Sequence, residues 1–122
     1  MSDQFDVVVI GGGPGGYSAA LYGASAGLNV ALVEMDALGG TCLNRGCIPA
    51  KAFLETAAVK RHVDHAAEFG INPPGHEEGK KSTVDFARTQ ARKQGIVDGL
   101  VGGIAAMCKG RKVEVFNGIG SL

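Results

Sequence analysis

The stretch Asp6-Val-Val-Val-Ile10-Gly11-Gly-Gly13-Pro14-Gly-Gly16 decides the fold class of this chain. It begins as a short run of β-branched residues, which is typical of a strand buried on both faces of a sheet. It continues as a glycine turn with the pattern G-x-G-x-x-G and enters an alanine-rich segment, residues 14–26. We expect a helix there, because a proline is tolerated in a first helical turn, where its missing N–H would be unpaired anyway.

A second buried strand is predicted over residues 29–34, Asn29-Val-Ala-Leu-Val-Glu34. Two buried strands joined by a helix form a βαβ unit, which forces the strands to pair in parallel. The glycine pattern alone is weak in a chain with 20 glycines, but here it stands between a strand and a helix, as a dinucleotide-binding fingerprint requires. The sequence therefore predicts an α/β, Rossmann-like domain with a parallel sheet.

The glycine turn predicts a phosphate site. Gly11 would make the tight turn, Gly13 would let the backbone approach a pyrophosphate, and Gly16 would allow close contact between helix and strand. The start of the helix at Pro14 offers free N–H groups and the positive end of the dipole. Glu34 closes the second strand, where a carboxylate accepts both hydroxyls of an adenosine ribose and repels a 2′-phosphate. We expect FAD or NAD rather than NADP; a glycine turn with an incidental surface glutamate is the alternative.

The rest of the chain predicts further helices and a third strand. An irregular, glycine-rich segment is expected over 38–49, then an amphipathic helix over 50–69. Residues 76–81 predict a polar surface loop, and Ser82, followed three residues later by Asp85, predicts the N-cap of a long helix that ends near Gly110. The alternation of Lys112-Val-Glu-Val-Phe116 indicates the third strand.

Cys42 and Cys47 are separated by four residues. In an ideal helix their Cα atoms would lie at least ~7.5 Å apart along the axis, whereas a disulfide needs less than about 7 Å. A bond therefore requires a distorted turn, which Gly46 and Pro49 would allow, and so strained a loop would be readily reduced. Cys47 would lie just ahead of a helix, where the dipole stabilises a thiolate.

Two other interpretations of this cysteine pair stay open: a metal site and two inert core cysteines. A metal site would need further ligands at suitable spacing, and His62, His65 and His76 offer no partner pattern, so no metal is expected. Cys108 has no close partner and is predicted to be a core or helix-face cysteine.

Lys51 follows Cys47 by four residues, so on a helix both side chains would lie on the same face and could point into the same pocket. A cation there would favour a thiolate and negative charge on a reduced flavin. The alternative is an ordinary solvated lysine.

Composition narrows the class of protein. The chain has 122 residues, 45% of them hydrophobic, and a formal net charge of zero, which fits one soluble domain and gives no electrostatic footprint for nucleic acid or an anionic membrane. The nearly uncharged stretch 7–33 is broken by glycines and a proline, so no membrane span is expected. An odd cysteine count without a basic, apolar export signal favours a reducing, cytoplasmic compartment.

The segment Gly39-Gly40-Thr41-Cys42-Leu-Asn-Arg-Gly-Cys47-Ile-Pro-Ala-Lys51 resembles the redox-active signature of the class I pyridine nucleotide–disulfide oxidoreductases. Members of that family begin with a glycine-rich FAD fingerprint similar to residues 5–34. The resemblance implies that residues 1–122 are the N-terminal part of a FAD-binding domain that includes the redox-active disulfide. The rest of that domain, the NAD domain and the dimer-interface domain are expected to lie outside the chain.

Within the family, Leu43, Ile48 and residues 109–120 resemble the lipoamide branch. This implies tightly bound FAD, oxidation of dihydrolipoamide on a lipoyl-bearing protein, NAD⁺ as acceptor, a homodimer formed through the C-terminal domain, and service in a 2-oxo acid dehydrogenase complex. A glutathione- or mercury-reducing relative is one alternative, and a simple FAD- or NAD-binding module without dithiol chemistry is another. The chain alone is expected to show no turnover, because the family's acid–base pair and nicotinamide site lie elsewhere.

The resemblance also implies roles for single residues. Cys42 would be the interchange thiol, Cys47 the thiolate stacked on the flavin, and Lys51 a tuning cation near the flavin ring. Arg45 and Ala50 depart from the usual valine and serine, and Arg45 could alter the surroundings of the disulfide. The residues expected to contact the cofactor are Gly11, Gly13, Pro14, Gly16, Glu34, Gly40, Thr41, Cys42, Lys51, Gly118 and Gly120.

Overall fold

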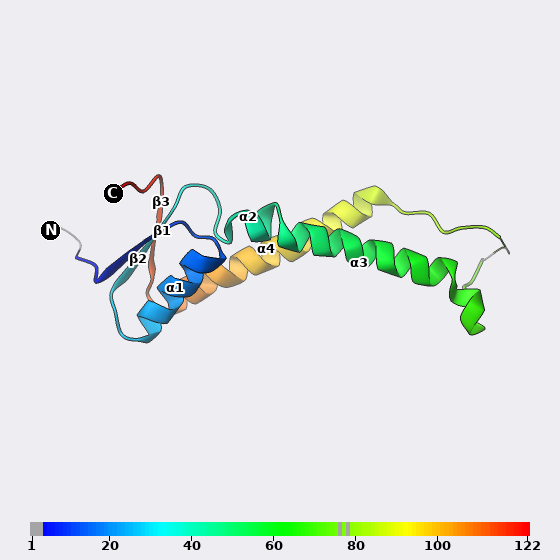
Figure 1. Ribbon diagram of the computed structural model, residues 1–122, viewed down its shortest axis with the longest axis horizontal. Helices are drawn as coiled ribbons and strands as arrows, with labels where there is room; N and C mark the ends of the chain where they lie inside the picture. The colour runs from blue at the N-terminus through cyan, green and yellow to red at the C-terminus, as the bar shows by residue number, and fades with distance from the viewer. Residues whose placement is uncertain (1–3, 76, 78) are drawn as a thin grey trace.

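The computed structural model describes residues 4–75, 77 and 79–122 of the chain, so residues 1–3, His76 and Glu78, the last two within the predicted surface loop 76–81, lie outside the described residues. The elements follow the predicted α/β order (Figure 1). They are β1 (Val7–Ile10), α1 (Pro14–Ser25), β2 (Val30–Glu34), α2 (Gly40–Asn44), α3 (Cys47–Asp64), the 3₁₀ turn η1 (Ala66–Phe69), α4 (Phe86–Gly110) and β3 (Glu114–Asn117).

The three strands form one parallel sheet in the order β1-β2-β3. Val8 is in register with Ala31, and Ala31 with Glu114. Helix α1 makes the crossover from β1 to β2 and packs against both strands. The predicted parallel βαβ unit and the third strand are therefore confirmed, and the carboxyl ends of all three strands meet at one edge of the sheet.

The core lies between the sheet and helices α1 and α4. Leu32, at the centre of the middle strand, is fully buried, and Cys108 of α4 is 1% exposed. Successive side chains of a strand point to opposite faces of the sheet, so Val30 and Leu32 both point toward the helices. The buried cluster consists of Ala20, Leu21, Val30, Leu32, Leu43, Ile104, Cys108 and Val113.

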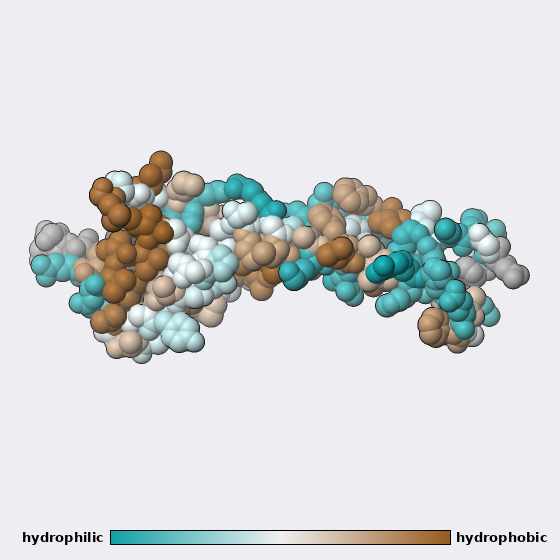
Figure 2. Space-filling view, in the orientation of Figure 1, coloured by the Kyte–Doolittle hydropathy of each residue, from teal (hydrophilic) through white to brown (hydrophobic). Residues whose placement is uncertain are grey.

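The prediction that β1 is buried on both faces is wrong. Val8 is 56% exposed and Ile10 is 48% exposed. Ile10 is in register with Val33 and Phe116, so these side chains share the face of the sheet that the helices do not cover. Figure 2 shows apolar side chains gathered at the sheet end of the molecule.

Helices α3 and α4 pack along each other and extend away from the sheet as a long hairpin (Figure 1). The segment 38–49, expected to be irregular, contains the short helix α2 and the start of α3 at Cys47. Pro49 does not stop α3, because the N–H groups of a first helical turn have no partner within the helix. The predicted helix over 50–69 ends at Asp64, and η1 follows it.

The expected N-cap at Ser82 is also wrong. Helix α4 begins at Phe86, and Asp85 caps it by accepting a hydrogen bond from the Arg88 N–H at 3.1 Å. Ser82 is held elsewhere: its N–H and its Oγ both donate to Asp64 Oδ1, at 2.6 and 2.5 Å. Ser82 therefore ties the approach to α4 to the end of α3.

We expect Asp64→Asn to lower the thermal unfolding midpoint at pH 7. The Asp64 side chain is 10% exposed, and hydrogen bonds from Lys60 and then from Ser82 hold the pKa of this carboxyl well below its usual range. A carboxyl group whose pKa is lowered by folding stabilises the folded protein at pH values above the usual carboxyl pKa. This stabilisation is lost as the pH falls toward the lower pKa of the folded state. Circular-dichroism melts at pH 7 and pH 3 should show a difference from wild type that shrinks in acid.

The matched control for this prediction is Asp98→Asn, which changes an exposed carboxylate on α4. It should leave the midpoint close to that of the wild type at both pH values. Equal midpoints for wild type and Asp64→Asn at pH 7 would show that the contact between Asp64 and Ser82 does not hold the hairpin.

Candidate cofactor and redox site

The glycine turn joins β1 to α1. Gly11 has φ +99°, a left-handed conformation that favours glycine, and its N–H donates to the Val33 carbonyl at 2.8 Å. A Cβ on Gly16 would lie 1.7 Å from the Gly11 carbonyl oxygen. Helix α1 starts at Pro14 without a side-chain cap, so its first N–H groups remain available. The tight turn and the close helix contact expected from the sequence are present; the cofactor contact of these residues stays a prediction.

Glu34 lies at the carboxyl end of β2 and reaches the glycine turn. Its Oε2 accepts the Gly12 N–H at 2.6 Å, and its Oε1 accepts the Asp36 N–H at 2.8 Å. Sequence reasoning missed both bonds, because the acid was assigned to a ribose alone. A carboxylate has about four acceptor positions, so two backbone bonds orient Glu34 and leave capacity for ribose hydroxyls.

The residues after β3 return to this edge of the sheet. The Gly118 N–H donates to the Glu34 carbonyl at 2.9 Å, and Gly120 passes so close to Ile10 that a Cβ would lie 3.0 Å from its side chain. Gly118 and Gly120 line a hollow of about 200 Å³ together with Gly11 and Glu34. This hollow lies at the carboxyl ends of the strands, where open α/β sheets bind their ligands.

The turn that carries the cysteines packs onto the glycine turn. The Gly39 N–H donates to the Gly12 carbonyl at 2.8 Å. Gly40 has φ +58°, and a Cβ on it would lie 2.7 Å from the Gly13 Cα. Gly40 and Thr41 also line a second hollow of about 170 Å³, which Glu34 shares with the first. The structure thus brings the predicted residues of both motifs to one edge of the sheet.

Cys42, Cys47 and Lys51 come together at the junction of α2 and α3. Gly46 separates the two helices, with φ −124° and ψ −107°, and a Cβ on it would lie 3.1 Å from the Thr41 carbonyl oxygen. This is the distorted turn expected between the cysteines. Both are thiols here, and the hydrogen bond with Cys47 is the main reason that the pKa of Cys42 is raised, while the Lys51 ammonium opposes the rise.

Arg45 lies between the cysteines in sequence, but its side chain meets a different group. Its guanidinium Nη2 lies 2.6 Å from Asp36 Oδ2. The residues that shift the pKa of the Cys42 thiol are Cys47 and Lys51, and Arg45 is not among them. The Arg45 side chain therefore pairs with Asp36, and no described contact joins it to either cysteine.

Cys108 behaves differently from the pair, as the sequence predicts. It is 1% exposed in the core, and burial raises the pKa of its thiol. We expect DTNB to react with the exposed Cys47 of the native protein, and Cys42 then to displace a second thionitrobenzoate by closing the Cys42–Cys47 disulfide. Cys108 should react only in denaturant.

The control is Cys108→Ala. This variant should release as much thionitrobenzoate as wild type in the native state, and one equivalent less than wild type in denaturant. Three thiols that react at one rate in the native protein would contradict the burial of Cys108.

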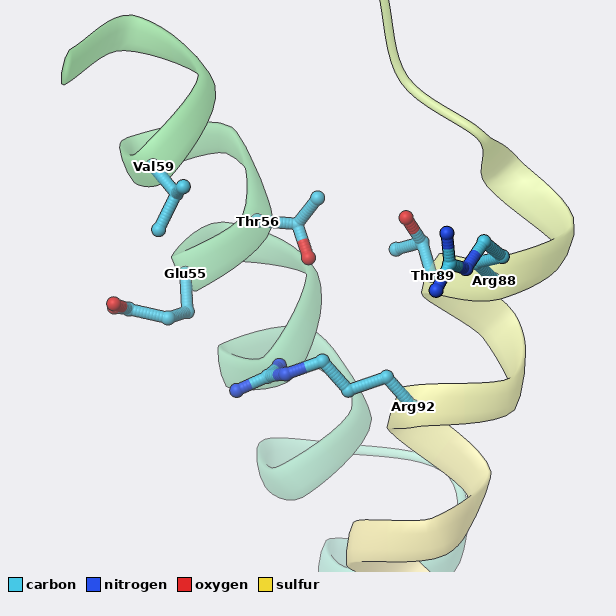
Figure 3. Close-up of a pocket in the computed structure, with 6 residues that line it drawn as sticks. All are labelled: Glu55, Thr56, Val59, Arg88, Thr89 and Arg92. Carbon is cyan, nitrogen blue, oxygen red and sulfur yellow. The ribbon is translucent and has the colours of Figure 1, made fainter. Parts of the chain in front are cut away.

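A larger hollow, of about 490 Å³, lies between α3 and α4 and shares no residue with either turn (Figure 3). Its two threonine hydroxyls are already engaged, since Thr56 Oγ1 donates to the Ala52 carbonyl and Thr89 Oγ1 donates to the Asp85 carbonyl. The remaining lining consists of Glu55, Val59, Arg88 and Arg92. Size alone therefore does not mark the candidate site.

Two further kinds of feature are absent from the described part of the chain. No group of three His, Cys, Asp or Glu side chains is placed there to hold a metal ion. No helix among these residues has both the length and the apolar character to cross a membrane.

Known proteins resemble this chain in sequence and in fold. The dihydrolipoyl dehydrogenase of Chlamydia pneumoniae is 44% identical over 122 residues, which are 100% of this chain and 25% of that protein. The dihydrolipoyl dehydrogenase of Bacillus subtilis is 43% identical over all of this chain and 24% of its own length. The crystal structure of LpdA from Mycobacterium tuberculosis superposes with a TM-score of 0.81 and 25% identity, over 94% of this chain and 24% of that one.

The chain therefore spans about a quarter of the length of these relatives. The family described as pyridine nucleotide-disulphide oxidoreductase matches residues 5–121, nearly the whole chain. Together with the parallel sheet, the glycine turn and the paired cysteines, this match shows that the chain belongs to the pyridine nucleotide-disulphide oxidoreductase family.

Proposed function

We propose that this chain is the FAD-binding and dithiol part of a dihydrolipoyl dehydrogenase, which oxidises protein-bound dihydrolipoamide and reduces NAD⁺. The observation that carries the proposal is the packing of the cysteine turn on the glycine turn at Gly40 and Gly13. It puts a dithiol beside a dinucleotide fingerprint, so a flavin nucleotide held by that turn could have its ring within reach of the cysteines. Relatives with the name dihydrolipoyl dehydrogenase support the choice of substrate.

FAD fits the residues at this edge of the sheet. The uncapped first turn of α1 would hold the pyrophosphate through the free N–H groups that follow Pro14, which has none itself, and Gly13 would let the backbone approach it. Glu34 would hold the adenosine ribose with the acceptor positions that its two backbone bonds leave free. Gly118 and Gly120 line the hollow beside it, where the absence of side chains leaves room for the adenine end.

The cysteines would perform thiol–disulfide exchange. A thiolate of dihydrolipoamide attacks the Cys42 sulfur of the oxidised pair, the Cys42–Cys47 bond breaks, and Cys47 leaves as a thiolate. The second substrate thiol then attacks the mixed disulfide, which releases lipoamide and Cys42; one dithiol is oxidised and one disulfide is reduced. Bound FAD would supply an acceptor for the electron pair that the reduced cysteines hold, and NAD⁺ would be the final acceptor.

The local structure suits the proposed roles of the two thiols. Cys47 is exposed and is the first residue of α3, where the N–H groups have no partner within the helix. Cys42 retains its proton to higher pH, because its hydrogen bond with Cys47 and its burial raise its pKa. Lys51, one turn into α3, adds a positive charge near the pair.

The wider assembly follows from the same proposal. A NAD⁺ site outside these residues, a homodimer, a lipoyl-bearing partner in a 2-oxo acid dehydrogenase complex, and a cytoplasmic location would complete the enzyme. These features are proposed from the relatives, of which the chain covers a quarter.

The test is FAD binding by Gly13→Ala. Gly13 has φ −71°, so alanine is unstrained there, and its Cβ would meet only the Gly40 Cα, at 3.9 Å. The methyl group would instead occupy the approach to the pyrophosphate, so we expect unchanged stability but at least about tenfold weaker FAD binding by flavin fluorescence. Gly15→Ala, whose Cβ meets nothing within 4 Å, is the control and should bind like wild type. Equal affinities for wild type and Gly13→Ala would contradict the proposed site.

A further inference from the structure

The ion pair between Arg45 and Asp36 bridges two segments that the proposed function uses. Arg45 is the C-cap of α2, in the turn between the cysteines, and Asp36 lies two residues after Glu34, the last residue of β2. The Arg45 Nη2 to Asp36 Oδ2 distance is 2.6 Å. We propose that Arg45 is a positioning residue that, through Asp36, clamps the segment carrying Glu34 against the cysteine turn.

A continuous series of contacts runs from Arg45 to the glycine turn. The Asp36 carboxylate meets Arg45, and the Asp36 N–H donates to Glu34 Oε1 at 2.8 Å. The other oxygen of Glu34 accepts the Gly12 N–H at 2.6 Å. A shift of Asp36 would therefore move the carboxylate that we assign to the ribose and loosen its bond to the turn.

The neighbouring residue Asn44 provides a second tether from the same helix end. Its Nδ2 donates to the carbonyls of Leu38 and Gly40, at 3.1 and 3.0 Å. Asn44 thus holds the far part of the segment, next to the cysteine turn, and Arg45 holds the near part, next to Glu34. Without Arg45, the side chains at the end of α2 would hold only one end of the segment 35–39, which joins β2 to α2.

The charged residues that line the second hollow also support a positioning role for Arg45. Among the residues that line it, Glu34 and Asp36 are acidic and Arg45 is the basic one. A bound dinucleotide would add the negative charge of its pyrophosphate at this edge of the sheet. The positive charge of Arg45 would reduce the repulsion between that charge and the Asp36 carboxylate. The pair is exposed, at 70% and 53% for the two side chains, so the effect on binding should be a few-fold rather than complete.

The first experiment uses the chain without cofactor. Amide hydrogen exchange of the Gly12 N–H is measured by NMR in wild type, Arg45→Gln, Asp36→Asn and Arg45→Lys, with Arg92→Gln of the α3–α4 hollow as the control for loss of an arginine. The clamp predicts exchange that is about threefold to fivefold faster in Arg45→Gln and Asp36→Asn, restored in Arg45→Lys and unchanged in Arg92→Gln. Unchanged exchange in both clamp variants would overturn the inference.

The second experiment measures FAD affinity of the same proteins. Arg45→Gln and Asp36→Asn should each weaken FAD about threefold to fivefold, the double variant should be no worse than either, and the swapped pair Arg45→Asp with Asp36→Arg should recover affinity. If Asp36→Asn instead tightens binding, Arg45 acts on the phosphates directly and the clamp is wrong. Failure of wild type to bind FAD would defeat the proposed function, while the exchange experiment would still decide the clamp.

Discussion

Replacing Gly16 by alanine is expected to destabilise the chain by about 3 kcal/mol, at the upper end of the usual cost of overpacking. The new Cβ would lie 1.7 Å from the Gly11 carbonyl oxygen and 2.9 Å from its carbonyl carbon. Both are backbone atoms, so no side-chain rotation can relieve the clash. Gly11 is itself fixed by its bond to Val33, so α1 would have to move away from the sheet.

Urea unfolding of Gly16→Ala beside Gly15→Ala measures this cost with a matched control. Gly15 is the neighbouring residue in the same first turn of α1, and a Cβ there meets nothing within 4 Å. Alanine at Gly15 should be neutral or stabilising by up to about 1 kcal/mol, because alanine is the better helix former. Equal unfolding free energies for the two variants would contradict the close contact of helix and turn.

Gly40→Ala should have the second large effect, a destabilisation of about 2–5 kcal/mol. Gly40 has φ +58°, a conformation that costs an alanine about 1–2 kcal/mol. Its Cβ would also lie 2.7 Å from the Gly13 Cα, which adds an overpacking cost of about 1–3 kcal/mol. The clash would push the cysteine turn away from the glycine turn, so FAD affinity should fall together with stability.

Gly70→Ala separates the two causes. Gly70 has φ +74°, and a Cβ there meets nothing within 4 Å, so this variant carries the backbone strain without the clash. We expect it to lose about 1–2 kcal/mol and to bind FAD as wild type does. Equal losses of stability in Gly40→Ala and Gly70→Ala would show that the two turns do not pack as tightly as the structure indicates.

The parts of the fold that follow local patterns could be predicted from the sequence. The β-branched run before Gly11, the proline at the start of α1 and the alternation around Val115 each act within a few residues. The same holds for the glycine turn, because its residues are neighbours in the sequence. The structure confirms the strands, the start of α1 and the glycine turn, while the redox role of Cys42 and Cys47 stays a prediction.

Contacts between distant residues explain what could not be predicted. Helix α2 has five residues, too few to show a period, and it is held by Leu43 in the core. Ser82 has the chemistry of an N-cap, but Asp64, 18 residues earlier, takes both of its donors, and Asp85 caps α4 instead. The bond from Arg45 to Asp36 likewise depends on how two loops meet. An apolar strand pattern such as β1 cannot tell how many of its faces are covered.

The most direct test of the central claim is an anaerobic absorbance titration of the FAD-loaded protein with dihydrolipoamide, without NAD⁺. Wild type is compared with Cys47→Ala. The account predicts a long-wavelength charge-transfer band in wild type that the variant lacks, because the Cys47 thiolate would stack on the flavin. If wild type binds FAD and shows no such band, the cysteines do not pass electrons to the flavin and the chain is a nucleotide-binding module alone.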